Sequence, residues 1–152
     1  MAHPLLTTVI GSFPKPAYLP IKDWFDAARN DGGMNTERVT EEFTDYIEKK
    51  SDTDEQLFIK ATKEVIRLQI EAGIDIPTDG EVRRENYIHY HCRHLKGFDF
   101  KNLEHRVLRD GAYETNLPAI RGEIRHTKAS YSVHDFESSQ NVSSKPVKFT
   151  LP

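Results

Sequence analysis

The sequence predicts an α/β fold, an incomplete TIM (β/α)8 barrel with roughly the first three strands and a hairpin-like insertion. Short apolar runs at 5–13, 75–78 and 147–151 have strand character, and helical patterns fill the chain between the first two runs. These two runs end in glycine beside a polar residue, as Gly11-Ser12 and Gly80-Glu81. Strands of a β/α barrel end at one mouth, so we expect the two pairs to meet.

The first run, LLTTVIGSF at 5–13, is apolar and β-branched and is followed by three prolines within seven residues. This pattern predicts a buried strand that leaves through a stiff loop. The second strand is expected at 75–78 and the third in KPVKFTLP, over 147–151. Right-handed crossovers place successive strands side by side, so the three should be parallel and adjacent.

Three helices are expected between the first two strands. A short amphipathic helix covers 21–31, and a second helix begins at Thr36 as its N-cap, in TERVTEEFTDYIEKKS. The strongest helical pattern covers 52–73 and stops at Gly73. Its predicted buried face consists of residues three or four positions apart, namely Leu57, Ala61, Val65, Leu68 and Ala72.

The second half of the chain is expected to begin with a helix, RENYIHYHCRHLKGF, that continues as far as Gly97. PAIRGEIRH at 118–126 predicts a short strand or one arm of a hairpin, and VHDFESSQ at 133–140 has helix potential. The sequence contains neither an internal repeat nor a low-complexity segment. The whole of 1–152 is therefore interpreted as a single partial barrel domain.

Composition narrows the classes of function. The 152 residues are 37% apolar and 30% charged with a net charge of -3, which describes a globular chain able to bury a sizeable core. Basic and acidic residues are interspersed, so nucleic acid is not an expected partner. Apolar runs are far shorter than the roughly 20 residues that span a bilayer, so no membrane association is expected. A single cysteine, Cys92, fits a reducing compartment, and a cytoplasmic location is expected.

The segment DIPTDGEVRRENYI at 75–88 holds the first candidate site. A strand that ends in acids and a glycine lies where parallel α/β folds place their chemistry, which draws attention to Glu81. Asp-Gly-Glu and Gly-Ser are also common turn sequences, so the spacing alone leaves a purely structural role open. Asp79 is interpreted as a turn or capping residue.

The segment HYHCRH at 89–94 invites a metal-site interpretation. On a helix each residue turns by about 100°, so only pairs such as His89 with Cys92, or His91 with His94, share a side. The four side chains then cannot converge on one ion. Packing among aromatic and histidine side chains is the favoured interpretation, and a small metal-binding protein is the alternative.

Three segments carry a resemblance to a known family: TTVIGSFPKP, EAGIDIPTDGEVRRENYIHYHCRHLKGFDF and KPVKFTLP. In this order they resemble the start of the catalytic barrel of cobalamin-independent methionine synthase and its single-barrel relatives, of the UROD/MetE-like superfamily. The resemblance runs through nearly the whole chain. It implies zinc-dependent methyl transfer from 5-methyltetrahydrofolate, as a polyglutamate, to the thiol of homocysteine, giving methionine without cobalamin.

The resemblance also implies a substrate site. The family's Ile-Gly-Ser segment, which holds the amino-acid substrate, falls on Ile10, Gly11 and Ser12, and the glutamate that meets the substrate's amino group falls on Glu81. Exposed N–H groups around a glycine, with a serine hydroxyl, suit a carboxylate, and a carboxylate side chain suits an ammonium group. Arg83 and Arg84 could hold an anionic folate tail but are interpreted as surface pairs with Glu85.

The zinc of the family is held by two cysteines, a histidine and a glutamate from later strands, so no metal ligand and no catalytic residue are expected within this chain. The resemblance thus implies a fragment that is inactive alone. Two alternatives stay open. The chain is a non-catalytic truncated module whose open sheet edge pairs with the missing remainder of the barrel, or it belongs to a related thiol methyltransferase with another acceptor.

Overall fold

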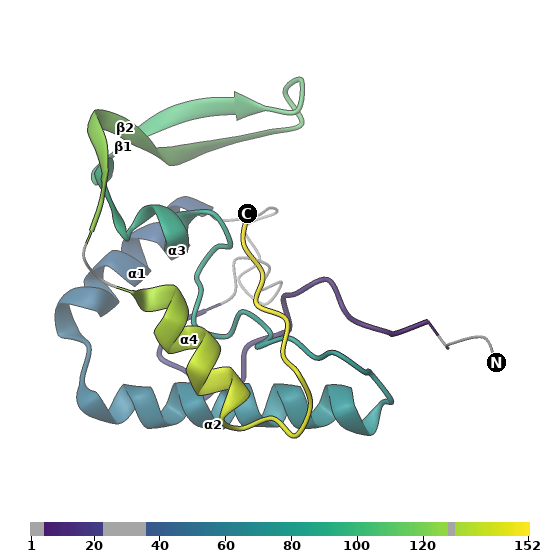
Figure 1. Cartoon of the computed structure of the whole chain (residues 1–152). Coiled ribbons are helices and arrows are strands. Elements are labelled where there is room, and N and C mark those ends of the chain that lie inside the picture. The colour runs from purple at the N-terminus through teal and green to yellow at the C-terminus, as the bar shows by residue number, and fades with distance from the viewer. Residues whose placement is uncertain (1–4, 23–35, 128–129) are drawn as a thin grey trace. The chain divides into compact units, whose positions relative to one another are not determined.

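The computed structural model describes residues 5–22, 36–127 and 130–152, and the helix expected over 21–31 lies almost wholly outside them. The described residues form two compact units (Figure 1). Unit 1 takes in the described parts of Met1–Leu19, Ser51–Arg83 and Ser130–Pro152. Unit 2 takes in those of Pro20–Lys50 and Arg84–Ala129. Among the described residues, no helix is both long and apolar enough to cross a membrane.

Unit 1 is built on helix α2, Asp52–Glu71, against which the shorter helix α4, Tyr131–Gln140, packs. Both helices are close to the predicted ones. The backbone N–H of Ser51 donates to the Asp54 carboxylate at 3.1 Å, which stabilises the first turn of α2. Past its end, Gly73 has a φ of +87° and donates to the Ile70 carbonyl, as expected of a helix-stopping glycine.

The buried face of α2 differs from the predicted face. Ala61 and Val65 are buried as expected, but Leu68 is 52% exposed and Ala72 is exposed. The helix instead buries a face that includes two polar residues, and its members are Phe58, Ala61, Thr62, Val65, Ile66 and Gln69. The prediction was wrong at these positions because it counted apolar residues alone.

Gln69 explains why a polar residue lies on that face. Its side-chain Oε1 accepts from the backbone N–H of Thr78 at 2.9 Å, and its Nε2 donates to the Thr78 carbonyl at 2.9 Å. The amide group therefore satisfies both backbone polar groups of a fully buried residue, as a neighbouring strand would. This contact fixes the 75–78 segment to α2.

The three expected strands are adjacent and parallel, as predicted. An isolated parallel bridge joins Thr8 to Ile76, and another joins Thr78 to Lys148. Backbone hydrogen bonds of 3.0 Å from Ile76 to the Thr7 carbonyl and 2.9 Å from Lys148 to the Pro77 carbonyl accompany them. The segments do not form a continuous ladder, and the regular sheet of the described chain is elsewhere.

The first segment is not buried as expected. Leu5 and Ile10 are 93% and 96% exposed, and on the third segment Leu151 is 68% exposed. The prediction took apolar, β-branched composition as a sign of burial on both faces. Here pairing to 75–78 along one side leaves Leu5, Leu6 and Ile10 exposed to solvent.

Unit 2 combines helix α1, Thr36–Lys49, the single turn α3, His89–Cys92, and a long antiparallel hairpin (Figure 1). The hairpin pairs β1, Leu95–Leu108, with β2, Tyr113–His126, and so confirms the expected hairpin-like insertion. Its register runs from Leu95 opposite His126 to Leu108 opposite Tyr113, with two irregularities along β1. Helix α1 packs against both strands.

The helix expected from 84 to Gly97 is wrong. Residues 85–88 form bends and turns, and the helical turn is limited to α3. Asn86 caps this turn, since its Oδ1 accepts from the backbone N–H groups of Ile88 and His89 at 2.8 and 3.1 Å. From Leu95 the backbone pairs with β2, so contacts distant in sequence override the local helical pattern.

Arg93 of unit 2 makes contacts that overturn a second expectation. Its guanidinium lies over the rings of Phe100 and Phe43, at 4.1 and 5.0 Å from their centroids. Its Nε donates to Glu85 Oε1 at 2.5 Å, and other nitrogens donate to Thr44 and to the Thr40 carbonyl. Glu85 is therefore a buried partner of Arg93, and the expected surface pairing with its neighbours in sequence is wrong.

Candidate functional site

The two glycine-containing strand ends meet within unit 1. A Cβ atom added to Gly11 would lie 2.4 Å from Glu81 Oε1, far inside van der Waals contact. The same atom would lie 3.3 Å from Thr150 Cγ2, on the third parallel segment. Gly11 is buried, so the absence of a side chain there is what lets the Glu81 carboxylate approach the first strand. The ends of all three parallel segments therefore converge at this point.

A tight turn positions Glu81. Gly80 and Glu81 have φ angles of +68° and +55°, two successive left-handed residues of the kind found at the centre of type I′ turns. The Asp79 carboxylate accepts from the Glu81 backbone N–H at 3.1 Å, which supports the interpretation of Asp79 as a turn residue. The Gly80 carbonyl accepts from the Phe13 backbone N–H at 2.9 Å and so ties the turn to the first segment.

Thr78 links the end of the first segment to the turn at Gly80. This fully buried side chain donates from Oγ1 to the Gly11 carbonyl at 3.0 Å and accepts from the Gly80 backbone N–H at 3.3 Å. One hydroxyl thus bonds to both glycines of the candidate site. Because the neighbouring helix holds Thr78 through Gln69, the register of Gly11 against Gly80 is fixed on both sides.

Thr150 is a member of the site that sequence reasoning missed. Its Oγ1 donates to Glu81 Oε1 at 2.8 Å, a charge-assisted hydrogen bond between the third segment and the turn after the second. The signal that could have found it is positional. Parallel strands end at one mouth, so a polar residue near the end of the third run belongs with Ser12 and Glu81.

The remaining sequence-predicted residues lie on the solvent side. Ser12 is exposed, and Ile10 is 96% exposed, so its side chain makes little contact with the rest of unit 1. Glu81 itself is half-buried. The arrangement therefore brings one half-buried carboxylate, backbone groups around a glycine and an exposed serine hydroxyl to the same strand ends.

Arg83 is buried directly after the turn and pairs with acids of both helices of unit 1. It makes two hydrogen bonds to the Glu55 carboxylate, at 2.9 and 2.7 Å, and its Nε lies 3.8 Å from Asp135. Its side chain is 7% exposed, and that of Asp135 is 4% exposed. This network joins the turn to α2 and α4, so the expected surface pairing of Arg83 with Glu85 is wrong.

The histidine and cysteine cluster at 89–94 is held by aromatic packing. His89 packs edge-on against Phe100, and its Nδ1 lies 3.2 Å from the Thr40 hydroxyl. Burial, and next the charge of Arg93, lowers the pKa of His89 to about 4. Burial raises the pKa of the Cys92 thiol, and the Glu85 carboxylate adds to the effect. In the part of the chain that the structure describes, no three His, Cys, Asp or Glu side chains are placed to hold a metal ion.

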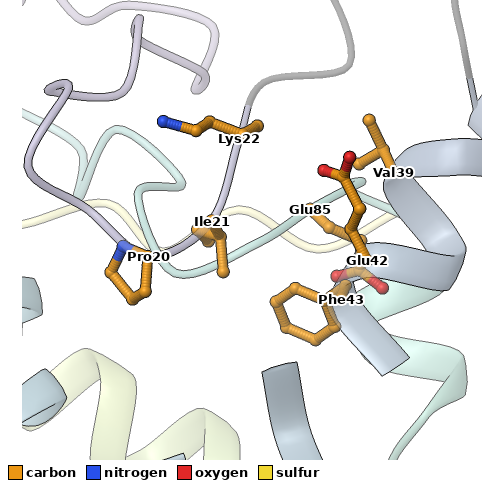
Figure 2. A pocket seen from close by; sticks show the side chains of 7 residues that line it. All are labelled: Pro20, Ile21, Lys22, Val39, Glu42, Phe43 and Glu85. Atoms are coloured by element: carbon orange, nitrogen blue, oxygen red, sulfur yellow. The ribbon is translucent and has the colours of Figure 1, made fainter. Parts of the chain in front are cut away.

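Unit 2 contains a small cavity that is lined in part by glutamate side chains. It measures about 20 Å³, enough for a single water. Figure 2 shows Lys22 extending away from Glu42 and Glu85. The lining consists of Pro20, Ile21, Lys22, Val39, Glu42, Phe43 and Glu85. Glu85 Oε2 is buried without a hydrogen-bond partner among the described residues, and burial raises the pKa of this carboxyl group. The cavity is too small for an amino acid.

Comparisons with known proteins identify a family for the chain. Residues 5–151 match the family described as "Cobalamin-independent synthase, Catalytic domain". A methionine synthase of Sulfolobus acidocaldarius is 35% identical over 122 residues, which cover 80% of this chain and 30% of that protein. One of Saccharolobus solfataricus is 37% identical over 98 residues, covering 64% of this chain and 24% of that protein.

A solved structure is also similar. The B12-independent methionine synthase of Shewanella sp. W3-18-1, in complex with selenomethionine, matches with a TM-score of 0.70 and 25% sequence identity. The match covers 96% of this chain and 37% of that one. The chain thus spans less than a third of the length of the curated relatives above. With a family match over nearly its whole length, the chain belongs to the catalytic-domain family of cobalamin-independent synthases.

Proposed function

We propose that this chain provides the amino-acid-binding part of a methyltransferase of the cobalamin-independent methionine synthase type. The reaction is transfer of a methyl group from 5-methyltetrahydrofolate, as a polyglutamate, to homocysteine to give methionine. The observation that carries the proposal is the approach of the Glu81 carboxylate to Gly11 where parallel segments end. Selenomethionine in the Shewanella structure, an amino acid with one ammonium and one carboxylate group, supports it.

The proposed roles follow from charge. Glu81 holds the ammonium group of the amino acid, and the backbone at Ile10 and Gly11, with the Ser12 hydroxyl, holds its carboxylate. A zwitterion needs one partner of each polarity, and the strand ends offer both within one small region. The bridged segments are then the first three strands of a (β/α)8 barrel, and 1–152 forms one partial barrel domain.

Zinc does not fit the residues described here. The chain has one cysteine, whose thiol pKa is raised, and no suitable cluster of His, Cys, Asp or Glu occurs in the described ranges. The family resemblance implies two cysteine ligands for the zinc, and a single cysteine supplies at most one of them. We therefore assign no catalytic residue and no metal ligand among the described residues, and we expect the isolated chain to be inactive in methyl transfer.

Calorimetric titration of the chain with L-methionine tests the proposal. Glu81→Gln keeps the shape of the side chain and removes its charge, so we expect affinity to fall about tenfold to a hundredfold. Glu71→Gln is a matched control, because Glu71 is an exposed acid at the end of α2, paired with Arg67. No saturable binding by the unaltered chain, or equal binding by Glu81→Gln, would refute the assignment. Competition by homocysteine and by cysteine then identifies the preferred acceptor.

A further inference from the structure

We propose that Thr150 is a positioning residue, whose hydroxyl orients the Glu81 carboxylate toward the ammonium group of the amino acid. This inference rests on the function proposed above and extends it to the third parallel segment. Its basis is the 2.8 Å hydrogen bond from Thr150 Oγ1 to Glu81 Oε1. Thr150 acts through Glu81 and needs no contact with the ligand.

The surroundings of Glu81 Oε1 limit where this oxygen can lie. Thr150 donates to it from the third segment, while the position of a Cβ on Gly11 lies 2.4 Å away on the first. The same Cβ position lies 3.3 Å from Thr150 Cγ2, so the threonine methyl and hydroxyl both face the meeting point. A carboxylate has about four acceptor sites on its two oxygens, so the bond from Thr150 takes up only one of them.

A glutamate at this position gains from such support. Its side chain has three rotatable bonds, and ordering them costs conformational entropy. Glu81 is only half-buried, so packing alone restricts its side chain less than full burial would. A fixed hydroxyl partner orders the carboxylate before the ligand arrives, and less ordering is then required on binding.

Thr150 is itself fixed by the parallel arrangement. Two residues earlier on the same face of the segment, Lys148 pairs with Thr78, and its ammonium group donates to the Val9 carbonyl at 2.5 Å. The third segment is thus tied to both of the others within two residues of Thr150. The hydroxyl is therefore presented by backbone that the first two segments hold in place.

The test combines three threonine variants with two ligands. Thr150→Val keeps the shape and removes the hydroxyl, and Thr150→Ser restores it. Thr8→Val is the matched control, since Thr8 also lies on a parallel segment and donates to a carbonyl, that of Ile76, at 2.7 Å. The ligands are L-methionine and its analogue in which hydrogen replaces the ammonium group, titrated by calorimetry. Thermal midpoints are recorded for every variant.

We expect Thr150→Val to weaken methionine binding about three- to tenfold, with Thr150→Ser and Thr8→Val within about twofold of the unaltered chain. Binding of the analogue without an ammonium group should be unchanged by Thr150→Val, because the effect passes through Glu81. In the double variant with Glu81→Gln, loss of the hydroxyl should add little, since both changes remove one interaction.

The outcomes separate this inference from the proposed function. If Glu81→Gln weakens binding and Thr150→Val does not, the site stands and the role of Thr150 is refuted. A Thr150→Val variant that weakens both ligands equally, that adds fully to Glu81→Gln, or that serine does not rescue also refutes it. No methionine binding by the unaltered chain overturns both proposals.

Discussion

Replacing Arg83 with methionine should strongly destabilise unit 1. The guanidinium binds Glu55 through two hydrogen bonds and lies 3.8 Å from Asp135, with 7% of the arginine side chain exposed. Methionine fills a similar length but leaves both acids without this partner. Removing one partner of a buried ion pair costs about 3–5 kcal/mol, because the remaining charge stays buried.

The solvent exposure of Glu55 and Asp135 decides where in this range the loss of unfolding free energy should lie. Glu55 keeps 25% of its side chain exposed and so retains part of its hydration, whereas Asp135 keeps only 4%. We therefore expect the lower end, about 3 kcal/mol off the free energy of unfolding of unit 1. With an m value of about 2 kcal/mol per molar urea, the midpoint falls by about 1.5 M.

Urea unfolding followed by circular dichroism measures this change, and hydrogen exchange of α2 and α4 shows whether it falls on unit 1. The matched control is Arg67→Met, because Arg67 lies on α2, the helix that carries Glu55, and makes an exposed pair with Glu71 at 3.5 Å. Exposed pairs of this kind contribute little, so the control should lie within about 0.5 kcal/mol of the unaltered chain. A result for Arg83→Met as small as that of the control would refute the buried network as a source of stability.

Three further predictions follow from the structure. Gly11→Ala places a methyl group 2.4 Å from Glu81 Oε1, so the flexible Glu81 side chain must move away. Calorimetry should then show methionine affinity falling at least about tenfold, with only a small change in the thermal midpoint of unfolding. Retained affinity would contradict the close approach of Glu81 to Gly11. Because burial lowers the pKa of His89 to about 4 from 6.5, the unfolded chain takes up a proton first as the pH falls. The free energy of unfolding should then drop by about 2–3 kcal/mol between about pH 6.5 and 4. His89→Gln should flatten this part of the pH profile of urea midpoints. Parallel profiles of the variant and the unaltered chain would argue against a role of His89. Elemental analysis of the isolated chain should find far less than one zinc per chain, and one tightly held zinc that Cys92→Ser removes would disprove this expectation.

Helices α1 and α2 could be predicted closely because their signals are local. Helix α1 begins at Thr36 and α2 at Asp52, as capping residues and apolar spacing indicate. Which face of α2 is buried could not be predicted in the same way. Gln69 is buried because its amide bonds to Thr78, and Leu68 is exposed as a result of that orientation. Such a contact depends on a residue nine positions away in another conformation.

For residues 84–98, by contrast, the local sequence pattern led to a wrong prediction of a helix. The run from Arg84 to Gly97 has apolar and aromatic side chains at helical spacing, yet pairing with β2 takes over from Leu95. Gly97 has a φ of +95° and packs so closely on β2 that a Cβ would lie 2.7 Å from the Glu123 carbonyl oxygen. A glycine that marked a helix end in the sequence instead permits two strands to approach.

The candidate site was partly predictable for a topological reason. The rule that parallel strands end together was enough to place Gly11 beside Glu81, and the structure has them in contact. Thr150 was not found, although the same rule applies to it, because a threonine inside a strand run is ordinarily interpreted as a β-former. Its role depends on the direction of one hydroxyl, which no spacing rule supplies.

The left-handed backbone of Glu81 bears on how this protein can evolve. At a φ of +55°, a glutamate is held in a conformation that asparagine or glycine adopts more easily, at a difference of about 1 kcal/mol. Under selection for stability alone, asparagine or glycine would therefore tend to replace the glutamate at position 81, and the carboxylate would be lost. On the proposed role of its carboxylate, a copy of this gene released from selection for amino-acid binding should lose Glu81 early.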